Sequence, residues 1–341
     1  MDPIVSLSHD LIKKGSKSFA MAARLLPRDV RYDSMMLYAW CRHCDDVIDD
    51  QILGFVRETA SEKSPAERLE ELRQKTKEAL AGHANEPVYI ALGRVAHKHG
   101  IPERHPMELL RGFEMDVNGR VYETIDDTLD YCYHVAGVVG VMMAMIMGVR
   151  DRQTLNRASD LGIAFQLTNI ARDVIEDARG GRCYLPRQWL REAGIEGGDL
   201  TDPKYRKAVF EVTHRLLREA DQYYRSALFG MQQLPLGASV GIGCARRVYR
   251  DIGRVVAARG ERAWDGRAIV GKSRKAAAAF SGAIAAIRAH TTLRFGYAPD
   301  RNGLWTVPNL GKPTPRNRPF VFLLNREMRQ LLRETSERLT V

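Results

Sequence analysis

The stretch GIAFQLTNIARDVIEDARGGRCYLP, residues 162–186, places apolar and polar side chains with the period of an α-helix. At 100° per residue, Gln166, Asn169, Asp173 and Asp177 fall within about 80° of one another and form one polar stripe. The other side carries the apolar residues that a core helix needs: Ile163, Leu167, Ile170 and Val174. The stretch therefore predicts a long helix with oxygen-bearing side chains along one face.

The same helical period recurs along most of the chain, while alternating β-branched strand patterns are nearly absent. We expect helices over residues 31–50, 66–81, 154–178, 204–230, 240–259 and 276–289. No internal repeat or low-complexity linker is visible. The pattern predicts an all-α fold with one domain, residues 1–290. Residues 291–341 follow as a basic extension rich in proline, glycine and asparagine, partly helical or loosely ordered, which could also dock on the body or on a membrane.

The segment Tyr131–Val149 (YCYHVAGVVGVMMAMIMGV) carries no formal charge over about the length that spans a bilayer. His134 and three glycines, without a flanking topology signal, favour a buried core helix over a membrane span. Its small residues Ala136, Gly140 and Ala144 recur every four positions. They predict a shallow face for close helix packing or for a ligand channel.

The whole composition describes a basic globular chain of 341 residues with a net charge of +10. Such a surface suits anionic partners: nucleic acid, an acidic membrane face or phosphorylated small molecules. Five cysteines, an odd number, indicate reduced thiols in a cytosolic compartment. Cys41 and Cys44 form a CxxC with no second pair at zinc-site spacing, so we interpret them as packing residues. No secretory signal pattern opens the chain, and we expect it to stay inside the cell.

A second acidic cluster lies in CRHCDDVIDD, residues 41–50. On a helix, residues four apart share a face, so Asp45 would point with Asp49, and Asp46 with Asp50. Carboxylates this close destabilise a helix unless a cation meets them. Magnesium prefers oxygen ligands and binds through a few carboxylates together with substrate phosphates. Two acidic stripes facing each other across a helical bundle would form an incomplete cage that a diphosphate completes.

Neither acidic motif is decisive alone, because each could be a solvated helix face. Asp126, Asp127 and Asp130 also spell DDxxD, but they follow Thr124. A threonine with an acid three residues later predicts a capping box, and acids are favoured in a first helical turn. We therefore interpret this third cluster as structural.

Four stretches together resemble the squalene/phytoene synthase family: GSKSFA, YAWCRHCDDVIDD, YCYHVAGVVG and GIAFQLTNIARDVIEDARGGRCYLP. The resemblance spans roughly residues 10–290 in order and spacing, and within the family it is strongest to bacterial enzymes of carotenoid biosynthesis. It implies an isoprenoid synthase fold, with helices around a large central cavity. It also implies that two geranylgeranyl diphosphates condense head to head to phytoene through prephytoene diphosphate, with magnesium, or manganese in its place, and without NADPH.

The resemblance also implies roles for individual residues. It places metal ligands in two motifs: Asp45, Asp46, Asp49 and Asp50 in the first, and Asn169, Asp173 and Asp177 in the second. It implies diphosphate or substrate contacts for Ser16, Ser18, Phe19, Arg42, Gln166, Asn169, Arg172, Tyr249 and Arg267. It makes Asp45, Asp49, Asp173 and Asp177 catalytic, with Tyr38 and Tyr131 near the reacting carbons, where aromatic faces stabilise allylic cations. From the residues alone, the serines could cap a helix, the tyrosines could be core residues, and Arg42 could simply pair with Asp45 or Asp46.

Several alternatives stay open at this stage. A dehydrosqualene or squalene synthase would use the shorter farnesyl diphosphate; the reductive version is disfavoured because no GxGxxG fingerprint occurs. A chain-elongating prenyl synthase would carry adjacent aspartates in its second motif. A non-catalytic helical assembly factor of the family would be expected to lose some carboxylates. Scattered basic residues without a recognised motif argue against nucleic acid.

Because phytoene is a hydrocarbon, the resemblance also implies product release into a bilayer. We therefore expect a cytoplasmic protein that associates peripherally with the inner membrane, with the basic extension as the candidate contact. The sequence does not predict an oligomeric state.

Overall fold

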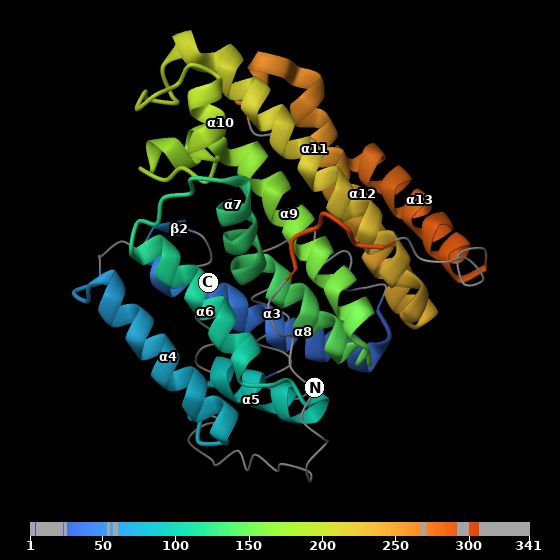
Figure 1. Cartoon of the computed structure of the whole chain (residues 1–341). Helices are drawn as coiled ribbons and strands as arrows, with labels where there is room; N and C mark the ends of the chain where they lie inside the picture. Colours follow the sequence, from blue (N-terminus) through green and yellow to red (C-terminus); the bar gives the residue numbers. More distant parts are fainter. Residues whose placement is uncertain are drawn as a thin grey trace. The chain divides into compact units, whose positions relative to one another are not determined.

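The computed structural model describes residues 4, 23, 26–52, 55–56, 61–266, 271–291 and 300–306. The regular secondary structure of its described part is helical apart from one antiparallel pair of two-residue strands, in which Gln51 pairs with Val56 and Ile52 with Phe55. The elements follow one another along the chain (Figure 1) as α3 Arg28–Ile48, β1 Gln51–Ile52, β2 Phe55–Val56, α4 Pro65–Ala81, α5 Pro87–His99, α6 Arg104–Val117, α7 Ile125–Cys132, the π-helix η1 Tyr133–Gly137, α8 Val138–Ile146, α9 Arg152–Arg179, α10 Arg187–Glu192, η2 Pro203–Tyr205, α11 Arg206–Gly230, η3 Met231–Gln233, α12 Leu236–Arg259, η4 Gly260–Arg262 and α13 Lys272–Thr291.

The all-α prediction is confirmed, and each predicted helix has a counterpart within a few residues. Helices α5, α6 and α10 were not predicted. The described residues fall into two compact units: unit 1 lies within Met1–Val117 and Met142–Arg150, and unit 2 within Asn118–Val141 and Asp151–Asn309. The expected border at residue 290 stays a prediction, although residues 300–306 belong to unit 2.

Unit 1 contains α3 to α6, with α3 supplying fully buried apolar side chains such as Leu37 and Trp40. One buried polar contact joins α3 to α5. Asp33, at 7% side-chain exposure, accepts hydrogen bonds from Lys98 Nζ at 2.6 Å and contacts His99 Nε2 at 2.7 Å. Burial would raise the pKa of Asp33, but the bonds to His99 and Lys98 outweigh it and lower that pKa. The pair therefore adds an ionic contact to the apolar packing between α3 and α5.

Unit 2 is organised around α9, which approaches η1 and α8 at backbone distance. A Cβ on Gly162 would lie 2.2 Å from the carbonyl oxygen of Ala136, and one on Gly140 would lie 2.4 Å from the carbonyl oxygen of Ala158. Real Cβ atoms do not approach an oxygen this closely, so both positions require glycine. The predicted shallow face at Ala136 and Gly140 is confirmed as a site of close helix packing.

The helical run Ile125–Ile146 is, among the described helices, the one that length and composition would allow to cross a membrane. In its most apolar window, 72% of the residues are buried inside the protein. The prediction of a buried core helix is therefore confirmed for this segment. The run is interrupted by the π-helix Tyr133–Gly137, which the sequence pattern did not indicate.

Residues 300–306 dock on unit 2 through a buried ion pair. Arg301 donates from Nε at 2.8 Å and from Nη2 at 2.5 Å to the two carboxylate oxygens of Asp160 on α9, whose side chain is 0% exposed. The backbone N–H of Trp305 donates to the Tyr223 hydroxyl at 3.0 Å, and the Trp305 ring lies 5.3 Å from that of Tyr133. The sequence left open whether the extension is loosely ordered or docks on the rest of the protein; residues 300–306 dock on it.

Candidate active site

The first acidic motif occupies the C-terminal end of α3 in unit 1. Arg42 donates to Asp46 at 2.8 Å and lies 2.9 Å from an Asp45 oxygen, so one guanidinium bridges both carboxylates. Burial would lower the pKa of Arg42, but Asp45 and Asp46 outweigh it and raise that pKa. Arg42 therefore pairs with Asp45 and Asp46 along the helix, as expected. It is also the arginine for which the family resemblance implies a contact with diphosphate.

Negative charge exceeds positive charge around Asp45. Its side chain is 42% exposed, yet its pKa is raised to about 6, first by burial and then by the carboxylates of Asp49, Asp46 and Asp116; Arg42 acts in the opposite direction. Asp116, from α6, was missed because no sequence motif joins it to residues 41–50. A carboxylate held among three others is the arrangement that a bound cation would relieve.

The prediction that one helix carries all four aspartates is wrong at its end, because α3 ends at Ile48. The N–H of Asp49 still donates to the Asp45 carbonyl at 3.0 Å, so Asp49 completes the last turn and stays near Asp45. Asp50 turns away with φ of +52°, and its carboxylate accepts a hydrogen bond from the N–H of Ser61 at 2.8 Å. Asp50 is thus held by the segment after the helix and lies beyond the helix on which its pairing with Asp46 was predicted.

The second motif lies on α9 in unit 2, and its predicted two-sided character is confirmed. The apolar residues Ile163, Leu167, Ile170 and Val174 are at most 3% exposed. The residues of the polar stripe are all of intermediate exposure: Gln166, Asn169, Asp173 and Asp177. Within the stripe, Asn169 Nδ2 donates to Gln166 Oε1 at 3.3 Å. One helix therefore presents an apolar face and a row of oxygen-bearing side chains that solvent still reaches.

Arg172 and Asp173 form a forked ion pair on this helix. The Arg172 Nε donates to Asp173 Oδ1 at 2.8 Å, and Nη2 donates to Oδ2. Burial alone would lower the pKa of Arg172, but the hydrogen bonds and charge of Asp173 raise it. Tyr249 of α12 lies in the same environment: burial raises its pKa, and Arg172 partly counters this. The Tyr249 ring stacks on Phe165 at 4.2 Å between centroids, so the described structure brings together Arg172, Asp173 and Tyr249.

The two tyrosines expected near the reacting carbons lie in different surroundings. Tyr38 is partly buried on α3, one turn before Arg42, and its hydroxyl interacts electrostatically with that guanidinium. Tyr131, on α7, is 4% exposed. Its ring stacks on Tyr184 at 4.7 Å and meets Tyr122 edge-on at 5.3 Å. Tyr131 thus belongs to an aromatic cluster in unit 2, which sequence spacing could not indicate.

Four further candidate residues lie outside the described part of the chain: Ser16, Ser18, Phe19 and Arg267. Their expected contacts with diphosphate or with the prenyl chain stay predictions.

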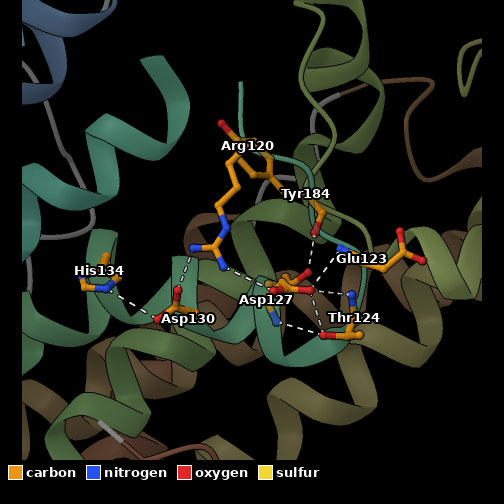
Figure 2. A network of polar contacts seen from close by, with 8 residues as sticks. Arg120, Glu123, Thr124, Asp127, Asp130, His134 and Tyr184 are labelled. Carbon is orange, nitrogen blue, oxygen red and sulfur yellow. Dashed lines mark hydrogen bonds and ion pairs between the residues drawn. The ribbon is translucent and has the colours of Figure 1, made fainter. Parts of the chain in front are cut away.

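The third acidic cluster is a structural network, as predicted (Figure 2). Thr124 caps α7 by accepting from the N–H of Asp127, and the Asp127 carboxylate accepts from the Thr124 N–H at 2.8 Å. Arg120 donates to Asp130 at 2.7 Å and to Asp127 at 3.3 Å, while His134 Nε2 lies 3.5 Å from Asp130. Burial would raise the pKa of Asp130, but its bonds to His134 and Arg120 lower it. The carboxylates of Asp127 and Asp130 are therefore bonded to the α7 cap and to Arg120.

Cys41 and Cys44 lie on α3, before the four aspartates of the first motif. Cys41 and Cys44 are free thiols, and burial raises the pKa of both well above its ordinary value. Among the described residues, no three histidine, cysteine, aspartate or glutamate side chains are grouped so that they could hold a metal ion by themselves. Oxygen atoms of carboxylates and amides are the donors that both motifs offer.

Comparison with known proteins agrees with this architecture. The family model "Squalene/phytoene synthase" matches residues 12–274. The 15-cis-phytoene synthase of Enterobacter agglomerans is 49% identical over 294 residues, covering 86% of this chain and 99% of that protein. That of Paracoccus sp. is 47% identical over 311 residues, covering 91% and 99%. A crystal structure of a ligand-bound dehydrosqualene synthase superposes with a TM-score of 0.73 at 26% identity, covering 82% and 95%. The chain therefore belongs to the squalene/phytoene synthase family.

Proposed function

We propose that this chain joins two molecules of geranylgeranyl diphosphate head to head and converts the product to phytoene in carotenoid biosynthesis. The observation that carries the proposal is the 49% identity to a 15-cis-phytoene synthase over 99% of that protein's length. The chain retains the residues of both acidic motifs, which favours an enzyme over a non-catalytic assembly factor. The identity of 49% to a 15-cis-phytoene synthase, against 26% to the dehydrosqualene synthase, favours the 20-carbon substrate over farnesyl diphosphate.

The reaction releases two diphosphates. In the first step, C1 of one allylic diphosphate loses its C–O bond, and the resulting cation is attacked by the C2–C3 double bond of the second molecule. Loss of a proton closes the cyclopropane of prephytoene diphosphate. In the second step the remaining C–O bond breaks, the carbon skeleton rearranges, and loss of a proton gives the central double bond of phytoene. No reductant is consumed, in keeping with the expected absence of NADPH.

The donors on α3 and α9 fit a hard divalent cation, for which we propose magnesium. Burial, and then the neighbouring carboxylates, raise the pKa of Asp45 to about 6, and carboxylate and amide oxygens are the ligands that magnesium prefers. We propose Asp45 and Asp49 at the end of α3, and Asn169, Asp173 and Asp177 on α9, as metal ligands, each motif described within its own unit, with Asp46 and Asp50 supporting the first motif. When bound, the cation neutralises charge that develops on the departing diphosphate.

The arginines have a separate role in this proposal. Arg42 and Arg172 each hold a carboxylate in this structure, at 2.8 Å between donor and acceptor in both cases. With a cation bound by those carboxylates, each guanidinium would be available to donate to diphosphate oxygens, for which its fork is well matched. Tyr38 and Tyr131 would present aromatic faces to the allylic cations, and Gln166 and Tyr249 would border the substrate.

The test is incubation with geranylgeranyl diphosphate and magnesium, followed by hydrocarbon and diphosphate analysis. We expect phytoene with two diphosphates released for each molecule formed, and little product from farnesyl diphosphate. Asp49→Ala and Asp173→Ala should each lower the rate by several orders of magnitude while the far-ultraviolet circular dichroism is unchanged, because charge neutralisation is worth several kcal/mol.

The control is Asp126→Ala, which removes an exposed aspartate from the third acidic cluster. It should leave turnover unchanged. Near-normal turnover in Asp49→Ala or Asp173→Ala, or a longer diphosphate in place of a hydrocarbon, would contradict the proposal.

We also propose that the protein is cytoplasmic and meets the membrane peripherally when it releases phytoene. The support is chemical: a 40-carbon hydrocarbon has no favourable place in water.

A further inference from the structure

Helix α13 presents its largest apolar side chains to solvent. Phe280 is 71% exposed, Ile284 41% and Ile287 51%. These residues are spaced at i, i+4 and i+7, and at 100° per residue they fall within about 60° of one another. They form a continuous row along one side of the helix, which we call the α13 row.

The opposite side of α13 packs against α12 through its smallest residues. Ala278 and Ala286 are at most 1% exposed. A Cβ on Gly282 would lie 2.6 Å from the backbone nitrogen of Cys244 on α12, so the two helices touch at their backbones; Figure 1 shows them running side by side. The usual amphipathic arrangement is thus inverted. Single exposed apolar residues are ordinary, but a contiguous row indicates an interaction surface.

The charge of α13 identifies the kind of partner. The helix holds four lysine and arginine residues and no aspartate or glutamate; the basic residues stand at its two ends: Lys272, Arg274, Lys275 and Arg288. A second copy of the chain would bring the same positive helix against itself, which like charge disfavours. By its sequence, an apolar row between basic residues matches a bilayer surface with anionic headgroups, which attract lysine and arginine.

We propose that the α13 row is the surface by which this chain contacts an anionic lipid bilayer. The inference rests on the proposed function, because membrane contact would serve to release a hydrocarbon product into an apolar phase. It differs from the sequence-based expectation, which assigned the membrane contact to residues 291–341. Of those residues, 300–306 are held on unit 2 by Arg301 and Trp305.

The test is flotation of the full-length protein with vesicles of phosphatidylglycerol and phosphatidylcholine, without substrate. The triple variant Phe280→Ser, Ile284→Ser, Ile287→Ser should lower the vesicle partition coefficient about tenfold or more. A matched triple variant with leucine at the three positions should bind as the natural protein does. Val121→Ser, which removes an apolar side chain that is 47% exposed outside α13, should also bind normally.

Three results would overturn the proposal: unchanged binding by the serine variant, loss of binding on deletion of residues 307–341 with the α13 row intact, or a dimer that the serine variant dissociates. Turnover of geranylgeranyl diphosphate in detergent micelles is measured on the same samples. The serine variant should keep that turnover, because detergent accepts the product. Absence of turnover in the natural protein would reject the proposed function and leave the flotation result standing on its own.

Discussion

The ion pair between Arg301 and Asp160 allows a stability prediction whose size follows from its burial. Arg301→Ala leaves a carboxylate that is 0% exposed with the Ser226 hydroxyl at 2.5 Å and the nearby charge of Arg157. Removing one partner of a buried pair costs about 3–5 kcal/mol. Burial already raises the pKa of Asp160 despite Arg301, so the variant should escape this cost by binding a proton.

Protonation of Asp160 limits how much stability Arg301→Ala can lose, and this limit depends on pH. An aspartate with an ordinary pKa near 3.9 costs about 4 kcal/mol to protonate at pH 7, and about 1.5 kcal/mol at pH 5. We therefore expect Arg301→Ala to lower the free energy of unfolding by about 3–4 kcal/mol at pH 7, and by about 1.5 kcal/mol at pH 5. Urea unfolding followed by tryptophan fluorescence measures both values, and Trp305 beside Tyr133 reports on the docked segment.

The control replaces both partners. Asp160→Asn with Arg301→Leu removes the buried charge and should recover most of the stability, with no change between pH 5 and pH 7. An equal loss for Arg301→Ala at the two pH values, or a double variant as unstable as the single one, would refute the reasoning. Either result would mean that residues 300–306 contribute to unit 2 by packing and not by neutralising Asp160.

Three further predictions concern stability. Gly162→Ala places a Cβ 2.2 Å from the Ala136 carbonyl oxygen, so we expect a loss of about 1–3 kcal/mol or more in urea unfolding; unchanged stability would show that the helices separate freely. Thr124→Ala removes the α7 cap and should cost about 1 kcal/mol, whereas Thr124→Ser should cost little. The lowered pKa of Asp33 contributes stability that is present above about pH 3.9 and is lost as the pH falls through the pKa of Asp33 in the folded protein. The difference in unfolding free energy between the natural protein and Asp33→Asn should therefore shrink below about pH 4. A constant difference would contradict this.

The features predictable from sequence are those coded by neighbouring residues. The two faces of α9 follow from spacing within one helix, and the cap at Thr124 follows from two residues three apart. The end of α3 was placed two residues too late, because it depends on contacts from later segments: Arg68 donates to the Ile48 carbonyl at 3.0 Å, and Ser61 donates to Asp50. Local periodicity carries no signal for such bonds.

Contacts between distant segments were beyond prediction for the same reason. Asp116 joins the carboxylates near Asp45 from another helix, and no motif marks it. Arg301 meets Asp160 across 141 positions, and an arginine in a polar segment carries no local sign of its partner. The metal ligands, the central cavity and the diphosphate contacts stay predictions that rest on family resemblance.

The link between Arg301 and Asp160 has a consequence for how the chain is made. On a ribosome that adds about 5–20 residues per second, the arginine follows its partner by roughly 7–28 s. During that interval the nascent α9 carries a carboxylate whose ion-pair partner in the finished interior, Arg301, is not yet synthesised. Unit 2 therefore completes its folding late in translation, and chains released before residue 301 would be preferred clients of chaperones and proteases.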